Sequence, residues 1–101
     1  MITISLLFTT KESAENVLKE MIADQLIYGG FIQSIEGWKR ESKLPKYNFQ
    51  FLLTGLTRAV AFSRIITSID KKFPSTEYLA YSNPMLNLSG NHEELLKKNV
   101  L

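Results

Sequence analysis

Cysteine is absent from this chain of 101 residues, and histidine occurs only once, at His92. Without cysteine the chain can form no disulfide, no thiolate metal site and no cysteine nucleophile. The net charge is only +2, and no run of lysine and arginine exceeds two residues, so nothing indicates a nucleic-acid surface. No apolar run approaches the roughly 20 residues that cross a bilayer, so we expect no membrane span.

The start of the chain carries no pattern of a secretory leader. Residues 2–8 are apolar but short, lack a basic beginning, and run into Thr9 and Thr10 instead of a small-residue cleavage site. Hydrophobic residues make up 45% of the chain and charged residues 22%, which is ordinary globular composition. We therefore expect one cytoplasmic domain spanning residues 1–101, without repeats or linkers.

No arrangement of side chains indicates catalysis. His92 stands beside Glu93 and Glu94, but adjacent ligands at a helix start rarely have the spacing that closes a metal site. We interpret His92 as solvent-facing and the two glutamates as favouring a helix N-terminus. Paired carboxylates, phosphate-binding glycine loops and a serine triad are also missing. The sequence thus predicts no catalytic residue, no metal ligand and no cofactor, and the protein is not expected to be an enzyme.

The first half of the chain predicts a strand, a helix and two further strands. Residues 2–8 predict a strand, and Thr9 or Thr10 then caps a helix whose apolar residues recur from Ala14 to Leu26. Gly29 and Gly30 are expected to break that helix and form a turn. Residues 31–42, with a bend at Gly37, and residues 47–56 predict two strands of a long hairpin, joined by a turn at 43–46.

The second half predicts a helix over 57–72 capped by Thr57, a strand over 76–82, and a helix over 93–100 capped by Asn91. Phe73 continues the apolar stripe of the first of these helices and should turn inward. The order is β-α-β-β-α-β with a short C-terminal helix. We predict an α+β, ferredoxin-like fold, in which two helices cover one face of an antiparallel sheet.

Residues 57–84 also resemble the matching segment of the CutA (divalent cation tolerance) family. That family has a T-R-x3-F-x2-[LI]-x3-I helix, an H-P-Y loop, and a strand that ends in proline. The matching positions are Thr57, Arg58, Phe62, Ile65, Ile69, Pro74 and Pro84. The resemblance implies a PII-like fold and a tight homotrimer that binds ligands in clefts between its subunits.

In the CutA family, several residues are linked to metal or ligand binding, and this chain has other residues at those positions. Gly29 stands at the cysteine position and Leu56 at the lysine position, while Phe73 and Ser75 replace the histidine and tyrosine of the loop. A phenyl ring has no lone pair for a metal ion. The resemblance therefore implies a divergent member without the family's metal site.

Four residues are the candidates for a ligand site in a subunit cleft: Trp38, Arg40, Arg58 and Tyr78. Either arginine would pair with a small anion. For Trp38 we favour burial against a neighbouring subunit as an interface anchor, and for Tyr78 we favour packing in the core or between subunits. Lys97 and Lys98, four residues after Glu93 and Glu94, indicate a solvated helix face.

The first functional hypothesis is a non-catalytic trimeric binding or scaffold protein that resembles CutA, with a link to the response to metal ions. The alternative is a PII-type regulator that senses a small molecule or nucleotide. An enzyme on the same fold is a third class, which the residue inventory does not favour.

Overall fold

The computed structural model describes residues 1–74, 77–85 and 87–101, with the backbone alone at Tyr47. Along the chain lie β1 (Ile2–Phe8), α1 (Lys11–Ala23), β2 (Gly29–Glu41), β3 (Leu44–Thr57), the 3₁₀ turn η1 (Ala59–Ala61), α2 (Phe62–Asp70), β4 (Tyr78–Pro84) and α3 (His92–Asn99). No helix in the described ranges is long and apolar enough to cross a membrane.

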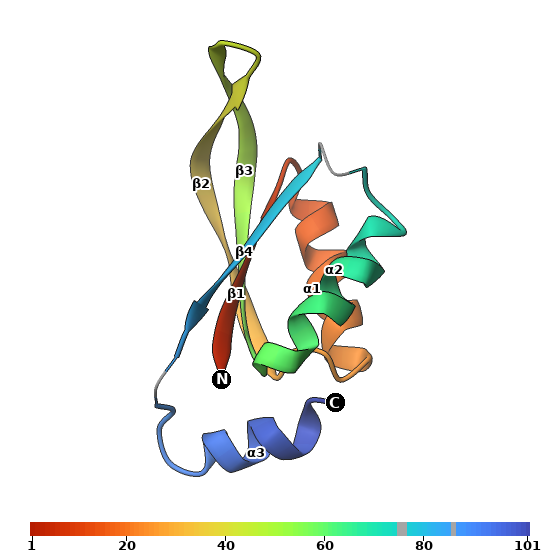
Figure 1. The fold of residues 1–101 in the computed structure, drawn as a ribbon, viewed down its shortest axis with the longest axis vertical. Coiled ribbons are helices and arrows are strands. Elements are labelled where there is room, and N and C mark those ends of the chain that lie inside the picture. Colours follow the sequence, from red (N-terminus) through yellow and green to blue (C-terminus); the bar gives the residue numbers. More distant parts are fainter. Residues whose placement is uncertain (75–76, 86) are drawn as a thin grey trace.

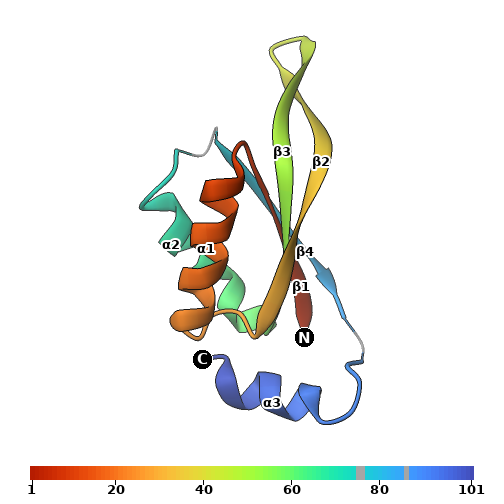
Figure 2. The ribbon, with the colours of Figure 1, turned by 180° about the vertical axis from the view of Figure 1, so that it is seen from behind.

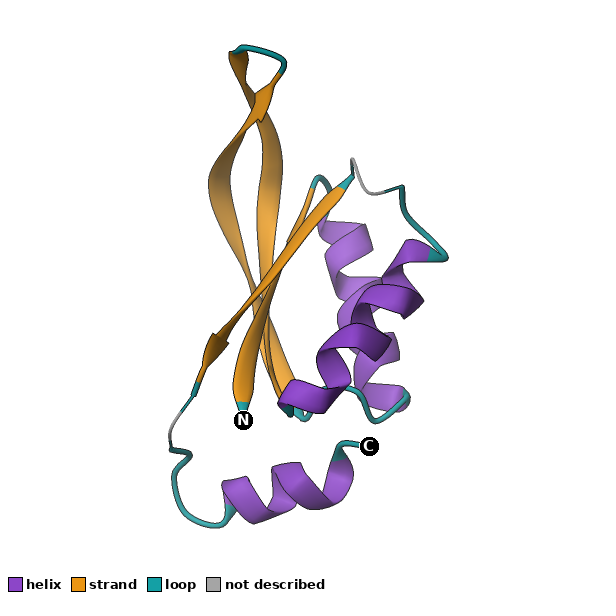
Figure 3. Cartoon of the chain, in the orientation of Figure 1, coloured by secondary structure: helices purple, strands orange, loops and turns teal. Residues whose placement is uncertain are grey.

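The four strands form one antiparallel sheet in the order β2-β3-β1-β4. Helices α1 and α2 lie side by side on one face of it, whereas α3 lies across the end where both termini are found (Figures 1 and 2). The predicted α+β, ferredoxin-like architecture is therefore confirmed. In Figure 3 the purple helices lie along one side and one end of the orange sheet, and its other face is open.

The core lies between the sheet and the two helices. Alternate residues of β1 point into it, because successive side chains of a strand face opposite ways. The helices contribute residues three and four positions apart, which share one helical face. Its fully buried members include Ile4, Leu6, Phe8, Ala14, Val17, Met21, Leu53, Ile65 and Ile69.

Helix α1 is capped by Thr10, one of the two predicted caps, but it ends earlier than expected. The Thr10 hydroxyl accepts a hydrogen bond from the Ser13 amide at 3.2 Å. The chain leaves the helix after Ala23 and turns at Gln25, whose φ of 59° is left-handed. The predicted break at Gly29 and Gly30 is wrong, because both glycines open strand β2.

Gly30 is required by the approach of two strands. A Cβ atom at this position would lie 2.3 Å from the backbone oxygen of Thr54 on β3, whereas one at Gly29 would meet no atom of the described residues within 4 Å. Strand pairing therefore excludes a side chain at Gly30 and leaves room for one at Gly29.

The β2–β3 hairpin projects beyond the rest of the sheet (Figure 1) and accounts for the 45 Å length of the molecule. The predicted bend at Gly37 is confirmed, since the strand register shifts on both sides of it. The turn predicted at residues 43–46 is wrong. Glu41 already pairs with Leu44 and Arg40 with Pro45, so the reversal occurs at 42–43, where Ser42 has φ 55°.

Thr57 does not cap a helix, contrary to the prediction. It is the last residue of β3 and fully buried, and its hydroxyl donates to the backbone oxygen of Leu26 at 2.5 Å. Arg58 is extended, η1 follows, and α2 proper runs only from Phe62 to Asp70 instead of 57–72. A buried hydroxyl needs a partner, and the carbonyl after α1 supplies it.

The last two elements lie one or two residues from their predicted places. Strand β4 begins at Tyr78 and ends at Pro84, so the predicted end at residue 82 is too early; the predicted start at Thr76 lies outside the described residues. Helix α3 begins at His92, and Asn91 precedes it without a capping hydrogen bond from its side chain. Leu96 and Val100 are buried, so α3 closes the end of the core.

Candidate functional site

The four predicted ligand residues fall into two groups at opposite ends of the sheet. Trp38 and Arg40 lie on the projecting hairpin, and Tyr78 pairs with Phe8 at the same end of β1. Arg58 follows Thr57, which pairs with Ile2 at the other end. One chain therefore does not bring Arg58 to the other three residues, and their joint role in a cleft between subunits stays a prediction.

Trp38 and Arg40 lie two residues apart on β2, so their side chains share one face of the hairpin. The Trp38 side chain is 58% exposed. The Nε of Arg40 donates a hydrogen bond to the Ser42 carbonyl at 2.8 Å, at the start of the turn. This pair offers a flat aromatic surface and a planar cation at the end of the ribbon.

Tyr78 is a packing residue within its own subunit. Its side chain is 8% exposed and stacks on Phe8 with ring centroids 6.5 Å apart. Its hydroxyl donates to Asp70 at the end of α2. Burial, followed by the hydrogen bond and the charge of Asp70, raises the pKa of Tyr78 to about 12. The phenol is therefore neutral at physiological pH, and it joins β4 to α2.

The positions that correspond to the CutA metal-binding residues are also divided. Gly29 and Leu56 are register partners at the start of β2. Phe73 lies at the far end, half-buried, with its ring centroid 5.7 Å from that of Phe8. The prediction that Phe73 packs inward is confirmed. Ser75 lies outside the described residues.

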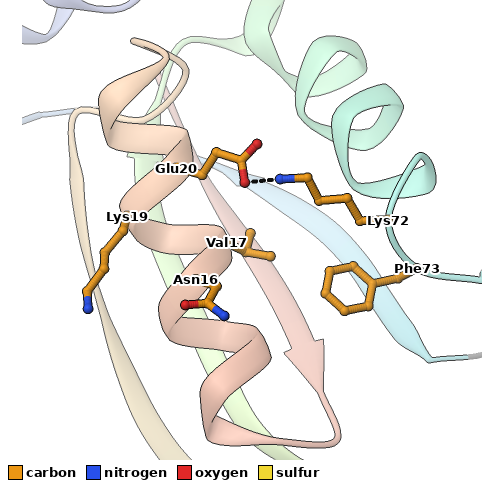
Figure 4. Close-up of a pocket in the computed structure, with 6 residues that line it drawn as sticks. All are labelled: Asn16, Val17, Lys19, Glu20, Lys72 and Phe73. Carbon is orange, nitrogen blue, oxygen red and sulfur yellow. Dashed lines mark hydrogen bonds and ion pairs between the residues drawn. The ribbon is translucent and has the colours of Figure 1, made fainter.

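A surface groove of about 600 Å³ opens beside Phe73, between α1 and the end of α2. Figure 4 shows Glu20 and Lys72 pointing toward each other across this groove, where they form an ion pair, while Lys19 points away. Phe73 and Val17 provide its apolar wall. The residues that line the groove include no hydroxyl, thiol or imidazole side chain, and two of its charged groups, Glu20 and Lys72, pair with each other.

A second cleft, of about 370 Å³, lies where α3 passes the end of the sheet. It is lined by Met1, Arg58, Ala59, Val60 and Lys97. Arg58 is half-buried, and Lys97 forms an exposed ion pair with Glu93 at 3.3 Å. Sequence analysis named Arg58 but treated Lys97 only as part of a solvated face. The two are far apart in sequence, and only the docking of α3 brings them together.

His92 is exposed, as predicted, but it also has a partner. Its Nδ1 lies 2.7 Å from the hydroxyl of Tyr28, which joins the start of α3 to the segment before β2. Within residues 1–74, 77–85 and 87–101, no three histidine, aspartate or glutamate side chains lie close enough together to hold a metal ion.

The uncovered side of the sheet carries an apolar surface, which we call the open face and define by Leu7, Phe31, Leu52, Leu79 and Tyr81. Leu7 pairs with both Leu52 and Leu79 in the strand register, so these three share a face. Phe31, Leu79 and Tyr81 are 54%, 48% and 45% exposed. Clustered aromatic and aliphatic side chains at this level of exposure are typical of an interaction surface.

The sheet order, the two helices on one face and the projecting hairpin define a class of α+β proteins, and known structures identify the particular fold within it. No family model matches the chain, and no curated protein is similar to it in sequence. The chain is similar to the CutA of Archaeoglobus fulgidus, a periplasmic divalent cation tolerance protein, with a TM-score of 0.89 and 16% identity over 100% of both chains.

Two further structures agree. CutA1 of Oryza sativa matches with a TM-score of 0.88 and 16% identity, covering 99% of this chain and 93% of that one. The divalent cation tolerance protein of Thermus thermophilus matches with a TM-score of 0.87 and 18% identity, covering 99% of both chains. The chain therefore has the fold of the CutA divalent cation tolerance proteins.

Proposed function

We propose that this chain is a non-catalytic, cytoplasmic binding or scaffold protein of the CutA type that assembles as a homotrimer. The open face of the sheet is the observation that supports this proposal most strongly. Burial of apolar surface contributes about 25 cal/mol per Å², so a face carrying Phe31, Leu79 and Tyr81 gains free energy when another subunit covers it. The CutA fold supports the same role.

The hairpin gives assembly a second contact. It extends beyond the other two strands of the sheet, so the backbone groups along its outer edges have no strand neighbour among the described residues of the subunit. Pairing with neighbouring subunits would satisfy these groups. We propose that the hairpin and the open face together hold the trimer, with Trp38 as an anchor between subunits.

Assembly would also complete the predicted ligand cleft. Within one subunit, Arg58 lies at one end of the sheet and the hairpin residues Trp38 and Arg40 lie at the other. They can therefore meet only when they belong to different subunits. A small anion is the ligand that two guanidinium groups and an aromatic ring would accept. Tyr78 would support such a cleft through packing.

The metal chemistry associated with the CutA family is not part of this proposal. Gly29, Leu56 and Phe73 provide no lone pair from their side chains at the positions that correspond to the family's metal site. A role in the response to metal ions would then proceed without a metal held at these positions.

The mass of the protein in solution tests the assembly. A trimer of this 11.5 kDa chain has a mass of 3 × 11.5 = 34.5 kDa by light scattering or sedimentation. Phe31→Ser on the open face should lower the trimer fraction, whereas Val60→Ser, at a position 64% exposed on η1, should leave it unchanged. Trp38→Ala should weaken assembly by about 2–4 kcal/mol if the ring is an interface anchor. A parent protein of 11.5 kDa at micromolar concentration rejects the proposal.

A further inference from the structure

The cleft between η1 and α3 has the composition of an anion site. Arg58 enters it from the end of β3 and Lys97 from α3, while Met1, Ala59 and Val60 complete its lining. Two of these five residues are cations and none carries a carboxylate. Positive charge thus faces a concave surface whose remaining walls are apolar.

The Arg58 guanidinium has no hydrogen-bond or ion-pair partner among the residues that the structure describes, although it is half-buried. A guanidinium stays charged at every accessible pH, and partial removal from water without an acceptor is unfavourable. An oxyanion would relieve that cost, because the planar fork of an arginine matches the two oxygens of a carboxylate or phosphate.

Lys97 is available as the second cation. Its ion pair with Glu93 spans one helical turn, and the two side chains are 61% and 41% exposed. Exposed pairs of this kind contribute little stability, so Lys97 can exchange Glu93 for a ligand. Leu96, the preceding residue, is fully buried and fixes this part of α3 against the core. The cleft is therefore formed before any ligand arrives.

We infer that this cleft binds a small molecule in which a short apolar group carries one carboxylate or phosphate. The oxyanion lies between Arg58 and Lys97, and the apolar group contacts Ala59 and Val60. A volume of about 370 Å³ accommodates a molecule of this size. The site shares Arg58 with the cleft proposed between subunits, but its other residues all belong to the same subunit. It needs neither Trp38 nor Arg40, so it does not depend on trimer assembly.

Binding also bears on α3. The ligand contacts both η1 and α3, so its binding free energy adds to the contacts that hold the helix against the core. Hydrogen bonds hold both ends of α3: one between Tyr28 and His92, and one that the Leu101 amide donates to the Gln25 carbonyl at 2.9 Å. The site therefore couples ligand binding to the docking of the C-terminal segment.

Isothermal titration with butyrate, monobutyl phosphate and inorganic phosphate tests the inference, with butanol as the uncharged control. We expect saturable binding at one site per chain for butyrate or monobutyl phosphate, weaker binding of inorganic phosphate, and none of butanol. The first two probes distinguish a carboxylate ligand from a phosphate ligand. Failure of both to bind overturns the inference.

Charge-matched variants locate the site. Arg58→Gln should weaken binding about tenfold or more, the loss expected when a charge-assisted pair is removed. Arg64→Gln, which removes the same charge from an exposed position on α2, should have no effect. Likewise Lys97→Gln should weaken binding several-fold and Lys98→Gln should not. Equal losses for both members of a pair would indicate nonspecific attraction and refute the site.

The pairing of Lys97 with Glu93 gives a third comparison. Glu93→Gln frees Lys97 and should tighten binding, whereas Glu94→Gln, with the same change of net charge, should leave it unchanged. Amide chemical shifts of Ala59 and Val60 should move on titration. Shifts confined to the hairpin around Arg40 would place the anion elsewhere and refute the inference. The solution mass, measured on the same samples, reports assembly separately.

Discussion

Replacing Phe73 by histidine, the residue type found at this position in the CutA family, should destabilise the protein. The Phe73 ring is half-buried against the core, and its centroid lies 5.7 Å from that of Phe8 at an interplanar angle of 59°. Full burial of a phenylalanine contributes about 1.5–3 kcal/mol, and a tilted aromatic pair adds about 0.5–1.5 kcal/mol. For a half-buried ring replaced by a polar one, we expect a loss of about 1–3 kcal/mol.

Urea denaturation, followed by circular dichroism, measures this loss. The stability of an oligomer depends on protomer concentration, so the parent and its variants are compared at one chain concentration. Phe73→Leu is the matched control, since it keeps an apolar side chain and removes only the aromatic contact. It should lose less stability than Phe73→His. Calorimetric titration of Phe73→His with copper and zinc should show no tight site, because Gly29 and Leu56 offer no ligand at the opposite end of the sheet.

A Phe73→His variant that is as stable as the parent would show that the ring contributes little to the core. If that variant also bound zinc tightly at one site per chain, Phe73 would face a ligand cleft and the metal site would lack only this residue. Equal losses for the histidine and leucine variants would contradict the expected extra cost of placing a polar ring in this apolar site.

Three other predictions test features of the fold. The raised pKa of Tyr78, about 12 in the folded state against 10 for the free side chain, means that its stabilising effect is complete below pH 10 and lost as pH rises through 12. The difference in free energy of unfolding between the parent and Tyr78→Phe, measured by denaturation, should therefore narrow by about 1–3 kcal/mol over that window. A difference that stays constant would contradict this. Gly30→Ala should cost about 1–3 kcal/mol in thermal unfolding and Gly29→Ala almost nothing, and equal costs would refute the assigned strand approach. Thr57→Val should cost about 1–3 kcal/mol in urea, because it leaves a buried carbonyl without its donor; an unchanged midpoint would be inconsistent with that hydrogen bond.

The order and type of the elements could be predicted because each depends on local periodicity. Strand β1 begins and ends at its predicted residues, and Ala14, Val17 and Met21 form the buried face of α1 as expected. The predicted inward packing of Phe73 follows from the same spacing of four residues. Such patterns depend only on residues within one helix or strand, so they can be recognised in a single sequence.

The wrong predictions concern residues whose role depends on a partner distant in the sequence. Thr57 precedes a helix and so resembles a cap, but its hydroxyl donates to Leu26, 31 residues earlier. Gly29 and Gly30 resemble a helix break, yet Gly30 is needed because Thr54 approaches it from β3. No local pattern contains either partner.

The candidate sites show the same limit. Arg58 is recognisable from the motif in which it lies, but Lys97 joins it only through the docking of α3. Tyr78 resembles a ligand residue on a strand, and its contact with Asp70 appears only when β4 lies beside α2. Residue type suggests chemistry, whereas the tertiary fold decides which groups meet.

β1 lies between β3 and β4 in the sheet, and this position affects the order in which the strands can pair during synthesis. Among the four strands of this sheet, β1 leaves the ribosome first, yet its two neighbours are residues 51–57 and 78–84. Helix α1 and the β2–β3 hairpin can form as soon as they emerge, since their contacts are local. Ile4, Leu6 and Phe8 must wait for residues more than 40 positions later, and β4 comes last of all. The most apolar strand of the nascent chain is therefore also the one that stays unpaired longest, which makes it the segment that a chaperone would protect.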